Sequence, residues 1–287
     1  MYNSSIFHDK KNQENYKNDA ITHNKLDLNS SLYLAYRDVP EILKAHLFDP
    51  LKKGAYRVLD YGCGAGLSTS IIKKMIEDAG YDAQIYGVDI SEDNIKQAKE
   101  RLPDAKLSTI SLNQSLAHLG EFDLIICNFV LVELKEKEIN HVLKDIHSLL
   151  TSSGITIVTN CTRKAYKKSN QWYTLNNDFI ENLAIASDDQ IPPEDSPIKF
   201  QVFASHNSSI SFTFFDFFHS GAAYRSQYKS VGLDLLATHK PLGKESDGLQ
   251  WKSEKEFSPY KIHVLSKTQP EPKAILEKSQ PLEQSMK

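Results

Sequence analysis

Two aspartates and three glycines make up the part of the chain whose residue types and spacing could do chemistry. Asp60 closes a short apolar run and is followed by Gly62, Gly64 and Gly66. Because glycine has no Cβ, its backbone N–H groups can approach a ligand closely. Asp89 ends the next apolar run, 23 positions after Gly66, a separation at which an acid can accept hydrogen bonds from a ribose diol. The pattern predicts a nucleoside site.

The spacing of the glycines argues against a dinucleotide site. Enzymes that bind dinucleotides typically show G-x-G-x-x-G, whereas this chain has glycines at alternate positions from Gly62 to Gly66, one residue tighter. The chain also carries no Tyr-x-x-x-Lys pair in a suitable helix. An NAD-dependent dehydrogenase is therefore disfavoured.

Alternating apolar runs and amphipathic stretches surround these residues. Strands are expected at 56–60, 84–88, 106–110, 122–128, 154–160, 233–242 and 260–267. One helix, with Pro40 near its start, should precede the first strand, and others are expected at 67–79, 92–101, 136–149 and 219–231. Repeated alternation with short turns predicts a parallel sheet with helices on both faces.

Four segments carry a resemblance to a known family: VLDYGCGAG at 58–66, YGVDIS at 86–91, FDLIICNFVLVEL at 122–134 and LLTSSGITIVTN at 149–160. Through them the chain resembles the class I S-adenosylmethionine-dependent methyltransferases, and within that class the small-molecule enzymes. The resemblance covers roughly residues 30–160. It implies S-adenosyl-L-methionine as cofactor and a Rossmann-like α/β fold. The sheet would have seven mostly parallel strands, with the last strand antiparallel between its neighbours.

The chain is expected to divide into a core and a small cap insertion. Residues 31–160 and 219–267 would form the core, and 161–218 the cap that contacts the substrate. The cap stretch holds two strand-like runs, and an insertion of this length is rarely a bare loop. Residues 1–30 have few apolar anchors, and 268–287 contain three prolines among charged residues, so both are expected to be flexible.

The resemblance implies cofactor contacts from the glycine loop, from two strand ends and from a segment before the first strand. Ile90 would cover the adenine face, and Asn128 would border the methionine moiety. The residues so assigned are Asp60, Gly62, Cys63, Gly64, Gly66, Asp89, Ile90, Asn128, Phe129, Tyr36 and Arg37. Structural alternatives stay open for three of them. Asp60 could be satisfied by loop amides, Asp89 could stabilise a helix N-terminus, and Arg37 could form a surface salt bridge.

One family feature is missing after the third strand. Relatives often have an acid there that binds the adenine amino group, but this chain reads Ser111-Leu112-Asn113. Either Asn113, or Ser111 with neighbouring backbone groups, would have to substitute. Because this acid is missing, an inactive regulatory or interaction protein that binds the cofactor is an alternative function for the chain.

Methyl transfer from a sulfonium is an in-line displacement, so positioning can supply roughly 7–11 kcal/mol of the barrier. Where the acceptor must also lose a proton, a general base adds roughly 10²–10⁴-fold. The candidates for that base are His219, Glu133 and Tyr224, together with Asp216. The alternative for His219 is a purely structural role. The alternative for Glu133 is that of a solvated acid at the start of a helix.

Charge and motif content favour a small-molecule acceptor. The net charge is −3 and the pI about 6.4, whereas chains that bind nucleic acid usually show a basic face. The fourth strand ends in CNFV, not in the [DNS]-P-P-[YFW] motif of DNA enzymes that methylate amino groups. An RNA or protein methyltransferase is the alternative. Aromatic residues of the insertion either form core or line a pocket for an apolar acceptor.

The remaining expectations concern metals, location and assembly. Cys63, Cys127 and Cys161 have no metal-ligand spacing and are odd in number, so neither a metal site nor a disulfide is predicted. No segment approaches the ~20 apolar residues of a membrane span. We expect a cytoplasmic protein with no membrane partner, and the sequence does not indicate an oligomeric state.

Overall fold

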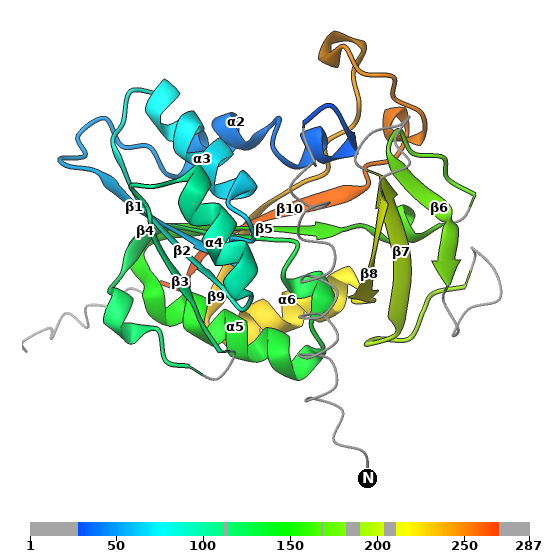
Figure 1. Ribbon diagram of the computed structural model, residues 1–287. Helices are drawn as coiled ribbons and strands as arrows, with labels where there is room; N and C mark the ends of the chain where they lie inside the picture. Colours follow the sequence, from blue (N-terminus) through cyan, green and yellow to red (C-terminus); the bar gives the residue numbers. More distant parts are fainter. Residues whose placement is uncertain (1–27, 112–113, 168, 182–189, 204–210, 270–287) are drawn as a thin grey trace, which may run out of the picture.

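A computed structural model describes residues 28–111, 114–167, 169–181, 190–203 and 211–269 of the chain (Figure 1). The flexible termini expected at 1–30 and 268–287 therefore fall almost wholly outside the described residues. In the part that is described, no helix is long and apolar enough to cross a membrane.

A seven-stranded sheet forms the central layer, in the order β3-β2-β1-β4-β5-β10-β9. Neighbours from β3 to β5 run parallel, and β10 is antiparallel to both β5 and β9. The strands are β1 (Tyr56–Tyr61), β2 (Ala83–Asp89), β3 (Lys106–Thr109), β4 (Phe122–Asn128), β5 (Leu150–Cys161), β9 (Leu233–His239) and β10 (Tyr260–Lys267). The reversed β10 and the strand order confirm the expected Rossmann-like architecture.

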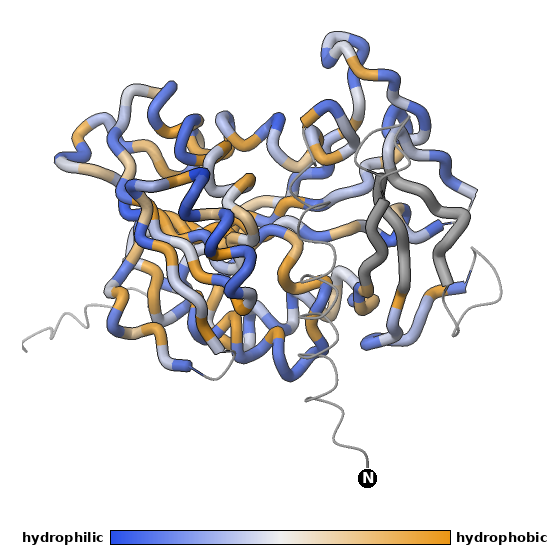
Figure 2. The backbone as a smooth tube through the Cα atoms, in the orientation of Figure 1, coloured by the Kyte–Doolittle hydropathy of each residue, from blue (hydrophilic) through white to orange (hydrophobic). Residues whose placement is uncertain are grey.

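Helices cover both faces of this sheet. On one face lie α2 (Val39–His46) and α3 (Leu67–Asp78), and on the other lie α5 (Glu136–Leu149) and α6 (Gly221–Ser230) (Figure 1). Figure 2 shows hydrophobic residues concentrated along the central strands. Since both faces of the sheet are covered, the near-continuous apolar runs of β4 and β5 are fully buried.

Two strand boundaries differ from those expected. β5 begins at Leu150 because that residue already pairs with Phe122, before a register shift and the regular ladder from Ile155. β9 ends at His239, which pairs with Ile262. The three residues after His239 leave the sheet. The other core elements, including α4 (Glu92–Arg101), lie where the sequence places them.

A second, antiparallel sheet lies beside the core in the order β6-β7-β8 (Figure 1). Its strands are β6 (Leu175–Glu181), β7 (Pro197–Phe203) and β8 (Ser211–Phe217). The sequence predicted two strands here, and the structure adds β6. Its polar run Leu175–Glu181 has little of the apolar alternation that marks a strand. The role of this sheet as a substrate cap stays a prediction.

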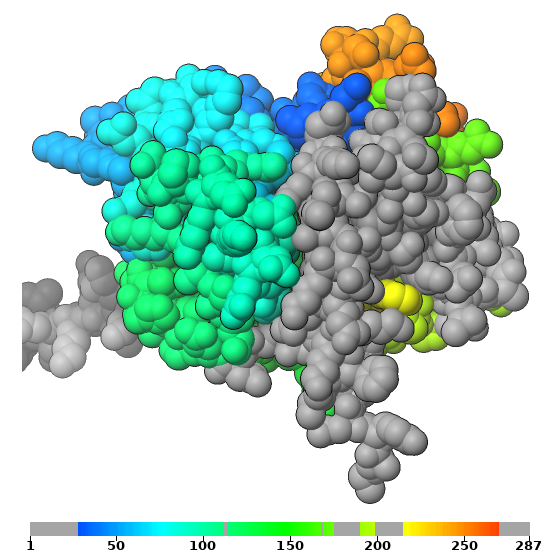
Figure 3. All heavy atoms as spheres, viewed as in Figure 1, coloured from blue at the N-terminus to red at the C-terminus, as the bar shows by residue number. Residues whose placement is uncertain are grey.

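The carboxylate of Glu254 joins distant parts of the chain. It is fully buried and accepts hydrogen bonds from Ser31 Oγ at 2.6 Å, Tyr173 N at 2.7 Å and Lys252 N at 3.1 Å. Ser31 begins the 3₁₀ helix η1 (Ser31–Ala35). In the space-filling view the orange segment that carries Glu254 lies against the blue N-terminal residues (Figure 3).

We predict that Glu254→Ala lowers the free energy of unfolding by about 3 kcal/mol, because it leaves buried donors without an acceptor. Urea denaturation measures this value. Glu245→Ala is the matched control, since the Glu245 side chain is 94% exposed and its loss should change stability by less than about 0.5 kcal/mol. Equal effects of the two substitutions would contradict the role given to Glu254.

Candidate functional site

The parallel register brings three polar strand ends to one edge of the sheet. β1 pairs with β2 on one side and with β4 on the other. Asp60, Asp89 and Asn128 therefore lie at neighbouring carboxyl ends, and the glycine loop between β1 and α3 runs beside them. This edge is where doubly wound sheets bind their ligands.

Each glycine of the loop has a positive φ, but their surroundings differ. A Cβ on Gly62 would collide with the side chain of Val130. Gly66, the N-cap of α3, approaches the backbone of Ala98 closely. Gly64 has no heavy atom within 4 Å of the position of a Cβ, counting the described residues. The open side of the loop is therefore at Gly64, where a ligand can reach the backbone.

The carboxylate of Asp89 fixes the loop in this position. Its Oδ2 accepts a hydrogen bond from Gly64 N at 2.9 Å, and its Oδ1 accepts from Ser91 N at 2.9 Å and Asn94 Nδ2 at 3.4 Å. Burial raises the pKa of Asp89 above its ordinary value. Each carboxylate oxygen has two lone pairs, so Oδ2 keeps one acceptor site for a ligand hydroxyl.

Asp60 and Asn128 present buried oxygens without partners. Thr69 Oγ1 donates to Asp60 Oδ2 at 2.7 Å, and Asn128 Nδ2 donates to Ser68 Oγ at 3.1 Å. Within the described residues, Asp60 Oδ1 and Asn128 Oδ1 have no hydrogen-bond partner. Burial raises the pKa of Asp60 to about 7. Buried acceptors are normally satisfied, so two unsatisfied oxygens at one strand edge suit a ligand that carries hydrogen-bond donors.

Two aromatic residues, Tyr36 and Phe129, lie beside Asn128 at this edge of the sheet. Tyr36, at the end of η1, is buried beside Ser68 and Asn128, and burial raises its pKa to about 12. Phe129 follows β4 with φ 60, a left-handed conformation that is uncommon outside glycine. Its ring meets that of Tyr260 edge-on, with centroids 5.1 Å apart. Strained backbone of this kind clusters at functional sites.

Three of the other residues assigned to the cofactor have partners elsewhere in the fold. The guanidinium of Arg37 binds Asp38 at 2.7 Å, Asp247 at 3.1 Å and Leu242 O at 2.6 Å. Ile90 packs against the core on the α5 side, and Cys63 is buried beside Leu107. For Arg37 the structure thus displays the salt bridge that the sequence left open as an alternative, and a cofactor contact stays a prediction.

The stretch after β3 is only partly described. Ser111 is exposed, and its N–H donates to Gln114 Oε1 at 3.3 Å. Leu112 and Asn113 lie outside the described residues. Their predicted contacts with the adenine therefore stay predictions.

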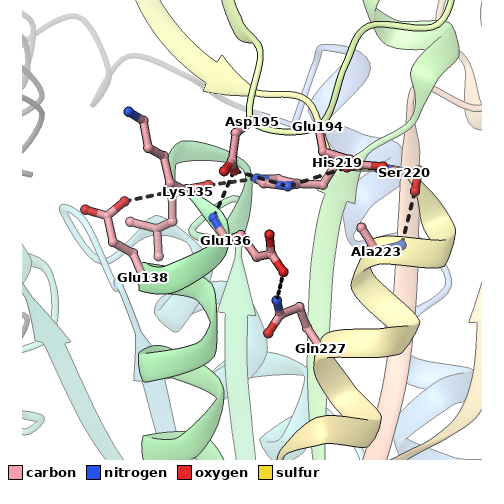
Figure 4. Close-up of polar contacts among 10 residues, drawn as sticks. Lys135, Glu136, Glu138, Glu194, Asp195, His219, Ser220, Ala223 and Gln227 are labelled. Atoms are coloured by element: carbon pink, nitrogen blue, oxygen red, sulfur yellow. Dashed lines mark hydrogen bonds and ion pairs between the residues drawn. The ribbon is translucent and has the colours of Figure 1, made fainter. Parts of the chain in front are cut away.

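His219 lies in a polar cluster between β8 and the start of α5 (Figure 4). Its Nε2 donates to Leu134 O at 2.8 Å. Its Nδ1 lies 3.8 Å from Asp195 Oδ1 and 3.9 Å from Glu194 Oε2. Because a carbonyl only accepts, Nε2 carries a proton, and Nδ1 is the nitrogen able to take another. Two carboxylates are placed to stabilise the resulting cation.

The other base candidates lie near this cluster. Glu133 is half-buried in the 3₁₀ helix η3 (Leu131–Glu133), directly before Leu134. Tyr224, in the first turn of α6, is buried with its ring centroid 5.4 Å from that of His219. Burial raises the pKa of Tyr224 well above its ordinary value, which disfavours a phenolate acting as base. Catalytic roles for all three residues stay predictions.

Sequence reasoning did not select several polar residues at this edge. Ser68 and Thr69 lie in the first turn of α3, just after the glycine loop. This position in the sequence could have identified them as residues of the site. Asn160 and Lys261 interrupt the apolar runs of β5 and β10, which marks them as polar side chains in buried strands.

Solved structures share this fold. The PH0226 protein of Pyrococcus horikoshii has a TM-score of 0.53 at 20% identity, covering 85% of this chain and 95% of that one. An amino pentose methyltransferase of Micromonospora echinaspora, CalS10, described as bound to S-adenosylmethionine, has a TM-score of 0.52 at 14% identity, covering 82% and 90%. At these identities the likeness shows a shared fold, that of the class I methyltransferases.

Sequence comparison shows the family. A family profile described as a methyltransferase domain matches residues 52–198, just over half of the 287 residues. The chain belongs to this methyltransferase family, which confirms the resemblance drawn from its motifs.

Curated relatives match over shorter stretches. The magnesium-protoporphyrin O-methyltransferase of Rhodobacter capsulatus is 33% identical over 93 residues, 31% of this chain and 39% of that protein. A ribosomal protein L11 methyltransferase of Thermotoga neapolitana is 34% identical over 109 residues, 37% of this chain and 39% of that protein. The chain thus spans less than half the length of each.

We predict that Asp60→Asn removes part of the pH dependence of stability. The pKa of Asp60 is about 7 in the folded chain against 3.8 ordinarily, so between these values the folded chain keeps a proton that the unfolded chain has lost. The free energy of unfolding of the wild type should therefore fall as pH rises through this range, by an amount on the order of a few kcal/mol.

Urea denaturation at about pH 5 and about pH 8 measures this fall. The fall should be smaller in Asp60→Asn, whereas Asp78→Asn, at an exposed position on α3, should behave like the wild type. An undiminished fall in Asp60→Asn would show that the carboxyl is ionised throughout.

Proposed function

We propose that this chain transfers a methyl group from S-adenosyl-L-methionine to a small-molecule acceptor. The observation that carries the proposal is the position of the Asp89 carboxylate, 2.9 Å from the N–H of Gly64 at the open side of the loop. A carboxylate beside an exposed backbone at this strand end suits a ribose diol.

The residues present fit the rest of this cofactor. Asp60 Oδ1 and Asn128 Oδ1 are acceptors without partners, and the cofactor offers hydroxyl and ammonium donors. The rings of Tyr36 and Phe129 lie beside them, and aromatic faces stabilise a cation such as a sulfonium. When bound, the cofactor would supply an electrophilic methyl group. The acceptor's lone pair would displace this methyl group from sulfur, with S-adenosylhomocysteine as the leaving group.

The chain's own part in the reaction is alignment and, where needed, proton removal. Holding the acceptor in line can contribute roughly 7–11 kcal/mol. For an acceptor that loses a proton, we propose His219 Nδ1 as the base, because Glu194 and Asp195 would stabilise the cation that forms. Glu133 and Tyr224 are the weaker candidates.

The net charge of the chain supports a small-molecule acceptor, and its unpaired cysteines support a cytoplasmic location. The net charge of −3 favours a small molecule over RNA. A protein acceptor is one alternative, because one relative is a ribosomal protein L11 methyltransferase. An inactive cofactor-binding protein is the other alternative. A cytoplasmic location stays a prediction from three unpaired cysteines.

We predict that the purified protein binds S-adenosylhomocysteine and that Asp89→Ala weakens this at least tenfold, since the substitution removes the ribose acceptor and frees the loop. Isothermal titration calorimetry measures both affinities. Asp93→Ala, an exposed acid in the first turn of α4, should bind like the wild type. No heat of binding in the wild type would refute the proposal.

We predict that His219→Gln lowers turnover at least 10²-fold in a screen that detects S-adenosylhomocysteine released with metabolite extracts. Glutamine can still donate to Leu134 O but cannot act as a base, so this variant separates the two roles of His219. Glu133→Ala and Tyr224→Phe are run beside it. If His219→Gln turned over at the wild-type rate, His219 would not be the base and would have a structural role only.

A further inference from the structure

Polar side chains lie on two neighbouring strands, and just past the end of a third, at the carboxyl edge of the sheet. Lys261 in β10 pairs with Asn160 in β5. Ile262 pairs with His239, the last residue of β9, and Lys240 follows directly after that strand end. Residues opposite one another across strands present their side chains on the same face of a sheet.

This face is the one covered by α6. His263, two residues after Lys261, binds the hydroxyl of Tyr228 at 2.9 Å through its Nδ1. Tyr224, one helical turn earlier, lies below Lys261 Nζ, which is 4.4 Å from the ring centroid. Arg225 follows Tyr224 and acts electrostatically on Lys261, as Lys240 does. Two further cations therefore act electrostatically on Lys261.

Lys261 is buried without a counter-ion. The residue is 8% exposed, and among the described residues no carboxylate lies within 4.0 Å of its Nζ. The nearby acid is Glu194, whose carboxylate instead accepts from Ser220 N at 2.9 Å. Burial, together with the charges of Lys240 and Arg225, lowers the pKa of Lys261 to about 8. An unpaired buried ammonium is costly.

The side chain of Asn160 is a second, independent observation that points to a ligand beside Lys261. It is fully buried, and neither its Nδ2 nor its Oδ1 has a hydrogen-bond partner within the described part of the chain. Its side chain stands directly beside that of Lys261. An ammonium and an amide N–H side by side are the donors that the two oxygens of one oxyanion require.

These polar side chains lie within reach of the methyl-transfer site. Asn128, the last residue of β4, pairs with Thr159 of β5. Asn160 and its partner Lys261 therefore lie one position beyond that pair, on the two strands that follow β4 in the sheet. Two strand spacings of about 4.8 Å place Lys261 about 10 Å from the end of β4. The ring of Tyr224 contacts both Lys261 Nζ and, edge-on, the ring of His219.

We propose that Lys261 and Asn160, with Arg225 and Lys240 around them, bind an oxyanion of the methyl acceptor, either a carboxylate or a phosphate. The acceptor is then a small anion whose reacting atom lies roughly 10 Å from its charged group. This inference rests on the proposed function and names the substrate class of that site.

The test uses the full chain saturated with S-adenosylhomocysteine and follows its thermal midpoint while sodium succinate or sodium phosphate is added. Sodium chloride at equal ionic strength is the reference. The wild type should show a saturable rise of at least about 3 °C with one of the two anions, and the responding anion identifies the oxyanion.

Lys261→Met, which keeps the length of the side chain, should lose this rise, and Lys261→Arg should keep it. Lys229→Met, at an exposed position in the last turn of α6, is the matched control and should respond like the wild type. No rise in the wild type with either anion, or an undiminished rise in Lys261→Met, would overturn the inference. Binding of S-adenosylhomocysteine is measured separately, so failure of the cofactor proposal is recognised on its own.

Discussion

The carboxylate of Asp89 accepts hydrogen bonds from two loops at once, from Gly64 N in the glycine loop and from Ser91 N at the start of α4. It can do so only because parallel pairing of β1 and β2 brings Asp60 beside Gly87 and both strands end at the same edge. The loop conformation, the open side at Gly64 and the first turn of α3 all follow from this interaction. A reversed strand would move Asp89 to the opposite edge of the sheet.

The site keeps polar groups that the fold alone does not satisfy. Asp60 Oδ1 and Asn128 Oδ1 lie where we propose that the cofactor binds, and Asn160 and Lys261 lie where we propose that the acceptor's oxyanion binds. Buried polar atoms without partners cost stability, of the order of 1–3 kcal/mol each for neutral groups. Such costs are found where function requires them. Asn128 ends β4, directly before Phe129 with its left-handed conformation, and Asn160 lies on the neighbouring strand β5.

The sequence predicted the core because its signals are local. Apolar runs, the glycine loop and the Ser91 cap set β1, α3, β2 and α4 within a residue or two of their observed bounds. The reversed β10 came from the family resemblance, since no local signal specifies strand direction. Interactions across long sequence distances were not predicted. Arg37 pairs with Asp247, 210 residues away, and Glu254 with Ser31, 223 residues away. Such partners depend on the tertiary fold, as does the placing of Lys261 beside Asn160.

A crystal structure of the protein with S-adenosylhomocysteine is the most direct test of the cofactor site proposed at the carboxyl ends of β1, β2 and β4. We expect a ribose hydroxyl within hydrogen-bond distance of Asp89 Oδ2 and the ligand's amino group near Asp60 or Asn128. Ligand density away from the carboxyl ends of β1, β2 and β4, or a ribose that makes no contact with Asp89, would contradict this proposal.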